Sequence, residues 1–236
     1  MTMPPVDTER DCYGVAGRTV LLSVIGSPGT GKSTLCGTLC RHYASQGLCV
    51  ERFEEHHIMT HPDYRTVAAE FGDSAQVAPG TLIDAFARYA GRCIDNGRDL
   101  VITDALIPHI PSLLAWGHSE SEIASVITEL EKVSGDLTVI IIMLTSDPAV
   151  TLPRAIAREA DGWADSYIQK LTAAPGTAHV VDLPTAIQHL RDEAAVSRRL
   201  ISRSGWQLIT VDATADPSRV AELVLERLGE RSAPSA

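Results

Sequence analysis

A glycine-rich loop, GSPGTGKST at 26–34, carries residue types that bind phosphate groups. Its spacing is G-x-x-x-x-G-K-S/T, with Gly26, Gly31, Lys32 and Ser33 at the defining positions. Glycine allows backbone angles that turn successive N–H groups inward, and a helix starting behind the loop adds the positive end of its dipole. We expect Lys32 to reach the β- and γ-phosphates of a nucleotide and Ser33 to ligate Mg²⁺. The candidate nucleotide-binding residues are Gly26, Ser27, Pro28, Gly29, Thr30, Gly31, Lys32, Ser33 and Thr34.

A second candidate, Asp104, follows the apolar run in DLVITDALIPHI. At the carboxyl end of a strand beside the phosphate-binding loop (P-loop), this carboxylate is expected to hold Mg²⁺ or to take a proton from an attacking hydroxyl. Capping of the following turn is the alternative role. Hydrolytic ATPases commonly have Glu after this Asp to activate water, and Ala105 cannot do so. The candidate metal ligands are Ser33 and Asp104.

Two arginines, Arg154 and Arg158, lie four residues apart in the stretch TSDPAVTLPRAIAREADGW. Asp147 followed by Pro148 is a typical helix start, and Pro153 is expected to kink or restart that helix just before Arg154. Both guanidinium groups then lie on one helix face, where they can bridge phosphates during phosphoryl transfer. Ion pairs with nearby acidic residues are the alternative. The candidate catalytic residues are Lys32, Asp104, Arg154 and Arg158, and a lid is expected at about 148–173.

Candidate acceptor-binding residues follow the second expected strand and the helix after it. VERFEEHH contains Glu54 and Glu55, and a carboxylate there can bind or deprotonate an acceptor hydroxyl, with only one of the two pointing inward. Arg88 and Arg92 are four residues apart and can grip an acceptor phosphate, although an ion pair between Arg88 and Asp84 is an equal alternative. The histidines after this strand are loosely spaced, so we interpret them as unpaired surface residues rather than metal ligands.

Strand-like and helix-like segments alternate along the chain, which predicts an α/β fold with a parallel sheet covered on both faces. The expected strands are Thr19–Ile25, Leu48–Phe53, Asp99–Thr103, Leu137–Leu144 and Trp206–Val211. The expected helices are Lys32–Gln46, Leu82–Asn96, Glu120–Val133, Pro148–Ala173, Pro184–Arg203 and Pro217–Leu228. We expect one domain over 17–230, with flexible ends at 1–16 and 231–236.

Composition and charge limit the partners of the chain. Its 236 residues are 44% hydrophobic, enough for a full core, and its net charge of -10 argues against a sequence-independent grip on nucleic acid. The apolar runs are too short to cross a bilayer and the first residues lack a signal-peptide pattern, so we expect a cytoplasmic protein without a membrane partner. The cysteines are expected to be reduced, with Cys36 and Cys40 in the core rather than at a metal site. They are Cys12, Cys36, Cys40, Cys49 and Cys93.

On these residues the chain resembles the P-loop nucleoside and nucleotide kinases, the group that contains thymidylate kinase and the deoxynucleoside kinases. The resemblance rests on GSPGTGKST, RFEEHH, NGRDLVITDA, RAIAREADGWADSYIQKL and WQLITVDATADPSRVAELVLERL. It implies a three-layer fold with a five-stranded parallel sheet, a helical lid carrying the arginines, and adenine near the loop 212–215. Two positions depart from the family pattern: Ala105 stands where members often have Arg, and Ile25 stands where thymidylate and deoxynucleoside kinases tend to have an acid.

The resemblance implies a phosphotransferase that uses ATP and Mg²⁺. The expected acceptor is a hydroxyl or phosphate of a small molecule, foremost a nucleoside or nucleoside monophosphate. A kinase for antibiotics or other metabolites on the same scaffold is the second candidate. A nucleotide-hydrolysing switch or ATPase is the third, but the sequence has neither N-K-x-D nor LSGGQ, and its single Asn, Asn96, is followed by GRD. A homodimer is compatible with all three.

Overall fold

The computed structural model describes residues 18–232, and its strands form one all-parallel sheet in the order β2-β3-β1-β4-β5. Central strand β1 pairs with β3 on one side and β4 on the other. Each strand expected from the sequence is present, with ends that differ by one or two residues. The strands are Val20–Ile25 (β1), Val50–Phe53 (β2), Leu100–Thr103 (β3), Thr138–Thr145 (β4) and Gln207–Asp212 (β5).

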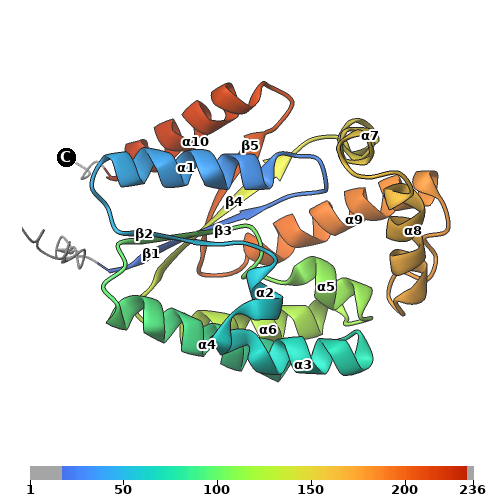
Figure 1. Ribbon diagram of the computed structural model, residues 1–236, viewed down its shortest axis with the longest axis horizontal. Helices are drawn as coiled ribbons and strands as arrows, with labels where there is room; N and C mark the ends of the chain where they lie inside the picture. The colour runs from blue at the N-terminus through green and yellow to red at the C-terminus, as the bar shows by residue number, and fades with distance from the viewer. Residues whose placement is uncertain (1–17, 233–236) are drawn as a thin grey trace, which may run out of the picture.

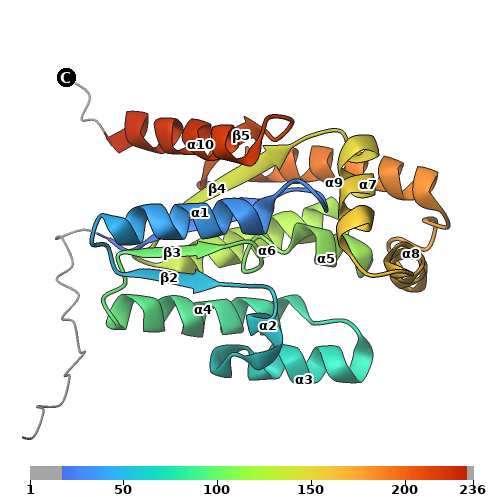
Figure 2. The same ribbon diagram turned by 45° about the horizontal axis from the view of Figure 1, so that its top comes forward.

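Helices cover both faces of the sheet, which confirms the three-layer α/β architecture (Figures 1 and 2). Helices α1 and α10 lie on one face, and α4 and α6 with the end of α9 lie on the other. The helices are Lys32–Ser45 (α1), His57–Thr60 (α2), Arg65–Ser74 (α3), Pro79–Asp95 (α4), Ile110–Ala115 (α5), Glu120–Ser134 (α6), Pro148–Arg158 (α7), Trp163–Ala173 (α8), Leu183–Ile201 (α9) and Pro217–Ser232 (α10), with a 3₁₀ turn at Pro62–Tyr64.

Alternation along the central strand divides the core into two layers. Leu21 packs with Phe86 and other residues of the α4 and α6 side, whereas its neighbour Leu22 packs with Leu39 of α1 and Val224 of α10. All five side chains are at most 1% exposed. Burial of each such side chain contributes about 1.5–3 kcal/mol, so the apolar strands are held from both sides.

The cysteines of the described part of the chain are free thiols, as expected. Cys36 is buried between α1 and the sheet, where burial raises its pKa to about 12, and Cys40 packs beside it. No group of three or more potential metal-ligating side chains occurs within residues 18–232. These two cysteines therefore belong to the core, while Cys12 lies outside the described residues.

The segment at 148–173 differs from the single helix that the sequence predicts. Helix α7 continues through Pro153 to Arg158, and the break falls at 159–162, where Gly162 has φ 81°. The sequence predicts a kink or a restart at Pro153, and the structure has no restart there. Leu152 and Ala155 on either side of the proline are each 1% exposed, and their burial outweighs the hydrogen bond that the proline cannot donate.

Other differences lie in connections that the sequence leaves as loops. Helices α2, α3 and α5 were not expected, and α10 extends to Ser232, inside the expected flexible tail. The expected flexible start at 1–16 and the last four residues lie outside the described part. Within 18–232, no helix combines the length and hydropathy needed to span a membrane.

The P-loop touches α7 through a glycine. Gly29 has φ +79°, and a Cβ built on it would lie only 2.0 Å from the backbone oxygen of Thr151 in α7. Gly26 is similarly restricted, because its φ is +150° and a Cβ would lie 2.7 Å from the backbone oxygen of Leu144 in β4. Glycine at these two positions therefore lets α7 and β4 approach the loop backbone directly.

The contact predicts unequal effects of two alanine substitutions in the same loop. Gly29→Ala should lower the free energy of unfolding by about 2 kcal/mol or more, because backbone atoms must separate as well as adopt a strained angle. Gly31→Ala is the matched control: it has φ +88° but no atom within 4 Å of its Cβ position, so about 1 kcal/mol is expected. Urea denaturation measures both, and equal losses would contradict the close contact.

Candidate functional site

The P-loop joins β1 to α1 at the carboxyl edge of the sheet. Gly31 is the N-cap of α1 in a left-handed conformation, and no side chain caps this helix end. Thr30 closes the loop on itself, since both its Oγ1 and its N donate to the carbonyl oxygen of Ser27, at 2.8 and 3.3 Å. An uncapped helix terminus behind a glycine-rich turn has the N–H groups and the dipole that can bind an anion.

Lys32 lies in this loop as expected. Its Nζ donates to the carbonyl oxygens of Gly26 at 2.7 Å and Ser27 at 3.3 Å, so its ammonium group lies against the loop backbone. Burial lowers the pKa of Lys32, while the negative charges of Asp104 and Glu193 raise it. The lysine therefore supplies a desolvated positive charge within a group of carboxylates.

Ser33 and Asp104, far apart in the sequence, meet through a hydrogen bond in which Ser33 Oγ donates to Asp104 Oδ2 at 2.6 Å. The turn after β3 is instead capped by Thr103, whose Oγ1 accepts from the N–H groups of Ala105 and Leu106 at 3.0 and 3.2 Å. Asp104 therefore faces the loop, and the alternative role as a turn cap falls to its neighbour.

This pair fits the Mg²⁺ expected from the sequence. A hydroxyl oxygen and a carboxylate oxygen are ligands that Mg²⁺ prefers, and it commonly takes its remaining ligands from phosphate and water. Ser33 and Asp104 provide two such oxygens beside the loop that would hold the phosphates. A site of this kind would be completed by its nucleotide.

Arg154 and Arg158 are exposed in α7. Arg158 donates to the neighbouring Glu159 at 2.6 Å, which is one of the expected alternative ion pairs. A Cβ built on Gly29 would lie 3.2 Å from the backbone nitrogen of Ala155. The backbone of the preceding residue, Arg154, therefore lies next to the loop. No ion pair is found for Arg154 within residues 18–232. Its guanidinium group is thus available to a ligand.

The carboxylates after β2 have different surroundings. Glu54 is half-buried and pairs with Arg52 at 3.1 Å and with His56 at 3.7 Å, whereas Glu55 is exposed. Arg52 also donates to the backbone oxygen of Ser33 at 3.3 Å. Arg52 therefore links the end of β2 to the first turn of α1. Glu55 forms no ion pair within residues 18–232, and its negative charge raises the pKa of Lys32.

Arg88 and Arg92 have partners inside the chain. Arg88 donates to the backbone oxygen of Asp63 at 2.9 Å and to Thr66 Oγ1 at 3.1 Å. Arg92 Nε donates to Asp63 Oδ2 at 2.7 Å, and its Nη2 lies 3.8 Å from Glu51 Oε1. The structure shows no pairing of Arg88 with Asp84 within 18–232. Both arginines instead attach the 3₁₀ turn and α3 to α4.

The histidines after β2 are not unpaired surface residues, so that interpretation is wrong for two of them. His57 Nδ1 accepts from the backbone N–H of Glu54 at 3.0 Å, and His61 Nδ1 accepts from that of Asp63 at 3.2 Å. His61 Nε2 also lies 2.7 Å from Arg92 Nη2. These imidazoles cap short turns, a role that their sequence spacing does not reveal.

One residue near the P-loop, Glu193 of α9, was not found by sequence reasoning. Its side chain is only 14% exposed, and burial raises its pKa to about 7, while the charge of Lys32 opposes that rise. The surrounding stretch, RDEAAVSRR, is typical of a solvated helix surface. Only the packing of α9 beside the loop brings this carboxylate to Lys32.

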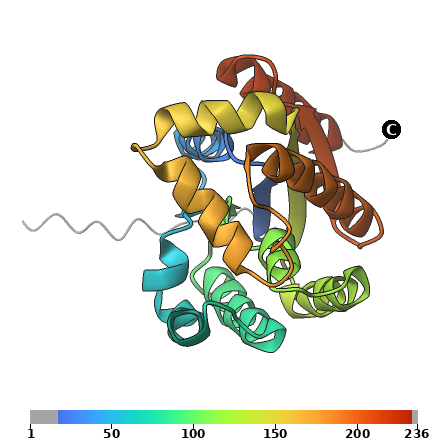
Figure 3. The ribbon, with the colours of Figure 1, turned by 90° about the vertical axis from the view of Figure 1, so that its right-hand side faces the viewer.

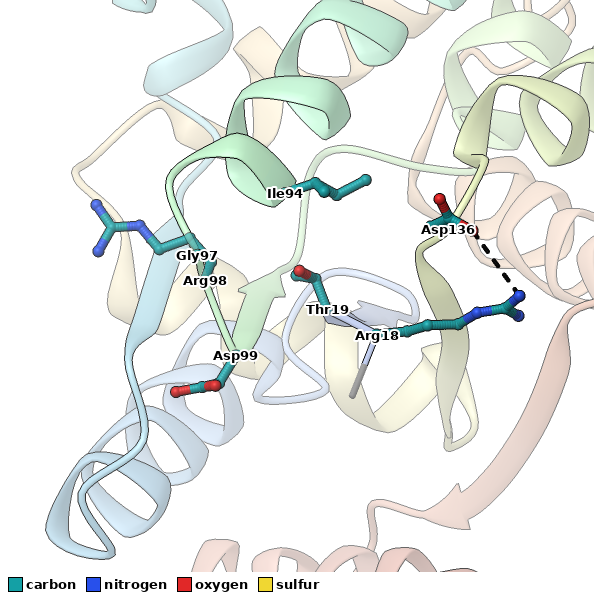
Figure 4. A pocket seen from close by; sticks show the side chains of 7 residues that line it. All are labelled: Arg18, Thr19, Ile94, Gly97, Arg98, Asp99 and Asp136. Carbon is teal, nitrogen blue, oxygen red and sulfur yellow. Dashed lines mark ion pairs between the residues drawn. The ribbon is translucent and has the colours of Figure 1, made fainter. Parts of the chain in front are cut away.

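Helices α7, α8 and α9 lie around the P-loop end of the sheet (Figure 3). Figure 3 shows α7 above the end of α1, α8 running across the front of the sheet, and α9 along the opposite side. A separate cavity of about 450 Å³ lies at the amino-terminal edge of the strands, away from this end (Figure 4). It is lined by Arg18, Thr19, Ile94, Gly97, Arg98, Asp99 and Asp136.

Comparison with known proteins gives a fold but no family. No protein-family model matches the sequence, and no curated protein matches it. Among solved structures, the crystal structure of APE1195 is similar, with a TM-score of 0.50 and 12% sequence identity, over 90% of this chain and 96% of APE1195. The chain thus shares its α/β fold with a protein of very different sequence.

The network around Arg92 predicts a structural role. Arg92→Ala should lower the free energy of unfolding by about 1–3 kcal/mol, because Asp63 loses its charged partner in a site where its side chain is only 18% exposed. Arg88→Ala is the matched control, since this exposed side chain bonds to a backbone carbonyl and a hydroxyl. Chemical denaturation of both variants tests this, and a larger loss for Arg88→Ala would contradict it.

Proposed function

We propose that this protein is an ATP-dependent phosphotransferase that moves the γ-phosphate of ATP to a small-molecule acceptor. The observation that carries the proposal is the hydrogen bond between Ser33 and Asp104 beside a glycine loop that holds Lys32. Phosphoryl transfer depends mainly on positioning and on stabilising charge. A loop of N–H donors, a half-buried lysine and a pair of oxygen ligands would supply both.

Each residue of the site has a distinct task in this reaction. The N–H groups of the loop bind the phosphates, and Lys32 leaves the carbonyl oxygens of Gly26 and Ser27 to neutralise the β- and γ-phosphates. Ser33 and Asp104 would hold Mg²⁺, which supplies positive charge to the phosphate oxygens when bound. In this proposal the carboxylate of Asp104 also accepts the proton of the attacking hydroxyl.

The acceptor class follows from the groups that remain unpaired. Nucleosides and nucleoside monophosphates are the first candidates, and antibiotics or other metabolites are the second. The intrachain contacts of Arg88 and Arg92 with Asp63 favour an acceptor without a phosphate. Glu55 is the free carboxylate on this side, and it can bind a hydroxyl. Ala105 lacks a side chain that activates water, so an ATPase or switch is the less favoured function.

The first test measures ATP turnover with and without a panel of nucleosides, nucleoside monophosphates and hydroxylated metabolites. A phosphotransferase should consume ATP rapidly only with its acceptor, whereas an ATPase should turn over alone. Lys32→Ala should remain folded and lose transfer, because the phosphates lose their buried countercharge. Activity within a few-fold of the wild type would contradict this role for Lys32.

Asp104→Asn provides a second test of the same site. We expect kcat to fall by roughly two orders of magnitude while nucleotide still binds, because metal positioning and proton transfer act mainly in the transition state. Thr103→Val is a useful control, since it removes the turn cap and leaves the carboxylate. An unchanged kcat in Asp104→Asn would remove Asp104 from the mechanism.

We further propose that 148–173 acts as a lid over the nucleotide. Arg154 would contact the phosphates and α8 would exclude water, so that the phosphoryl group reaches the acceptor. Amide hydrogen exchange in this segment should slow when a bisubstrate analogue is added, while exchange in α6 stays constant as an internal reference. Equal exchange of 148–173 with and without the analogue would contradict the lid.

A further inference from the structure

His61 lies between two hydrogen-bond donors, one facing each nitrogen of its imidazole ring. The backbone nitrogen of Asp63 lies 3.2 Å from Nδ1, and Nη2 of Arg92, on α4, lies 2.7 Å from Nε2. A neutral imidazole has one acceptor nitrogen and one N–H group, so it can accept from one of these donors at a time. An imidazolium has an N–H on both nitrogens and can accept from neither. The surroundings of His61 therefore fit the neutral ring only.

The charged groups around His61 balance one another without it. Arg92 Nε lies 2.7 Å from Asp63 Oδ2, and Arg98 Nε lies 3.0 Å from Glu51 Oε2, which makes two cations and two carboxylates. These four side chains are between 17% and 35% exposed, so water screens their charges only in part. A proton on His61 would add a third cation, 2.7 Å from a guanidinium nitrogen. Its Nδ1 faces Asp63 Oδ2 at 3.7 Å, but Arg92 already binds that oxygen.

The other groups that face His61 offer no further negative charge. His57 of α2 accepts a hydrogen bond from a backbone N–H at its Nδ1. Burial and the charge of Arg92 lower the pKa of His61, which keeps its ring neutral near pH 7. Three aromatic rings have centroids 5.8, 6.4 and 5.4 Å from that of His61, and they belong to Phe53 of β2, Tyr64 of the 3₁₀ turn and Tyr89 of α4.

We propose that His61 is an acid-sensitive latch, which holds the turn at 61–64 against α4 while its ring is neutral and releases that turn when its ring is protonated. Protonation replaces the contact between Nε2 and Arg92 by repulsion between two cations, and it makes His61 compete with Arg92 for Asp63. The turn joins α2, which follows the end of β2, to α3, so its release would loosen this side of the sheet. All of these contacts lie within the chain, and the latch therefore does not depend on the proposed function.

The direction of the pH effect follows from proton linkage. The pKa of His61 is lowered in the closed latch, whereas the open form has about the ordinary value of 6.5. The open form therefore binds more protons as the pH falls below about 6.5, and acid shifts the equilibrium toward it. The latch should be at full strength at pH 7.5 and weakened at pH 5.5.

Amide hydrogen exchange of the wild type and of His61→Gln at these two pH values tests the latch, because glutamine keeps an acceptor oxygen for Arg92 and does not titrate. After correction for the intrinsic pH dependence of exchange, protection of 61–74 in the wild type should fall about three- to tenfold from pH 7.5 to 5.5. In His61→Gln it should change by less than about twofold. His56→Gln is the matched control: its side chain is 64% exposed and lies 3.7 Å from the carboxylate of Glu54, so the variant should keep the wild-type pH dependence.

Two results would overturn the latch. If protection of 61–74 falls equally in the wild type and in His61→Gln, other groups cause the pH dependence. If NMR titration of the wild type shows that His61 gains its proton at or above pH 6.5, the surroundings accept the charged ring. The NMR measurement uses the wild type alone, so it decides the matter even if His61→Gln does not fold. Neither result bears on the phosphate site, which ATP turnover tests separately.

Discussion

The hydrogen bond between Ser33 and Asp104 depends on the order of strands in the sheet. Ser33 follows β1 and Asp104 follows β3, and these strands are direct neighbours in parallel register, with Ser23 opposite Thr103. If β1 and β3 were separated by another strand, the hydroxyl and the carboxylate could not meet. The two apolar layers that cover the sheet therefore serve the site as well as the fold, because they fix which strand ends are adjacent.

The sequence predicts what depends on local pattern. Short apolar runs predict the strands. The glycines of the loop predict where its backbone turns, since the positive φ angles occur at Gly26, Gly29 and Gly31. Asp104 could be identified because it follows a buried strand. These features need only periodicity, a motif and the rule that parallel strands end at one edge. The fold and the core of the candidate site were accessible for that reason.

The remaining features depend on contacts between segments far apart in the chain. Glu193 was missed because its helix has an ordinary polar pattern, and only tertiary packing buries it. The partners of Arg92 were missed because Asp63 lies in an irregular segment whose path the pattern does not define. The break at 159–162 was misplaced because burial around Pro153 outweighs the local preference of proline. In each case long-range packing overrides a local signal.

The close approach of Gly29 and Thr151 also distinguishes the two helices of the segment 148–173. Helix α7 rests with a backbone oxygen on the P-loop, so it cannot tilt without moving the loop as well. Helix α8 follows a break that contains Gly162, and none of its residues is fully buried. The break at 159–162 therefore separates a helix that contacts the P-loop from one that has no fully buried residue.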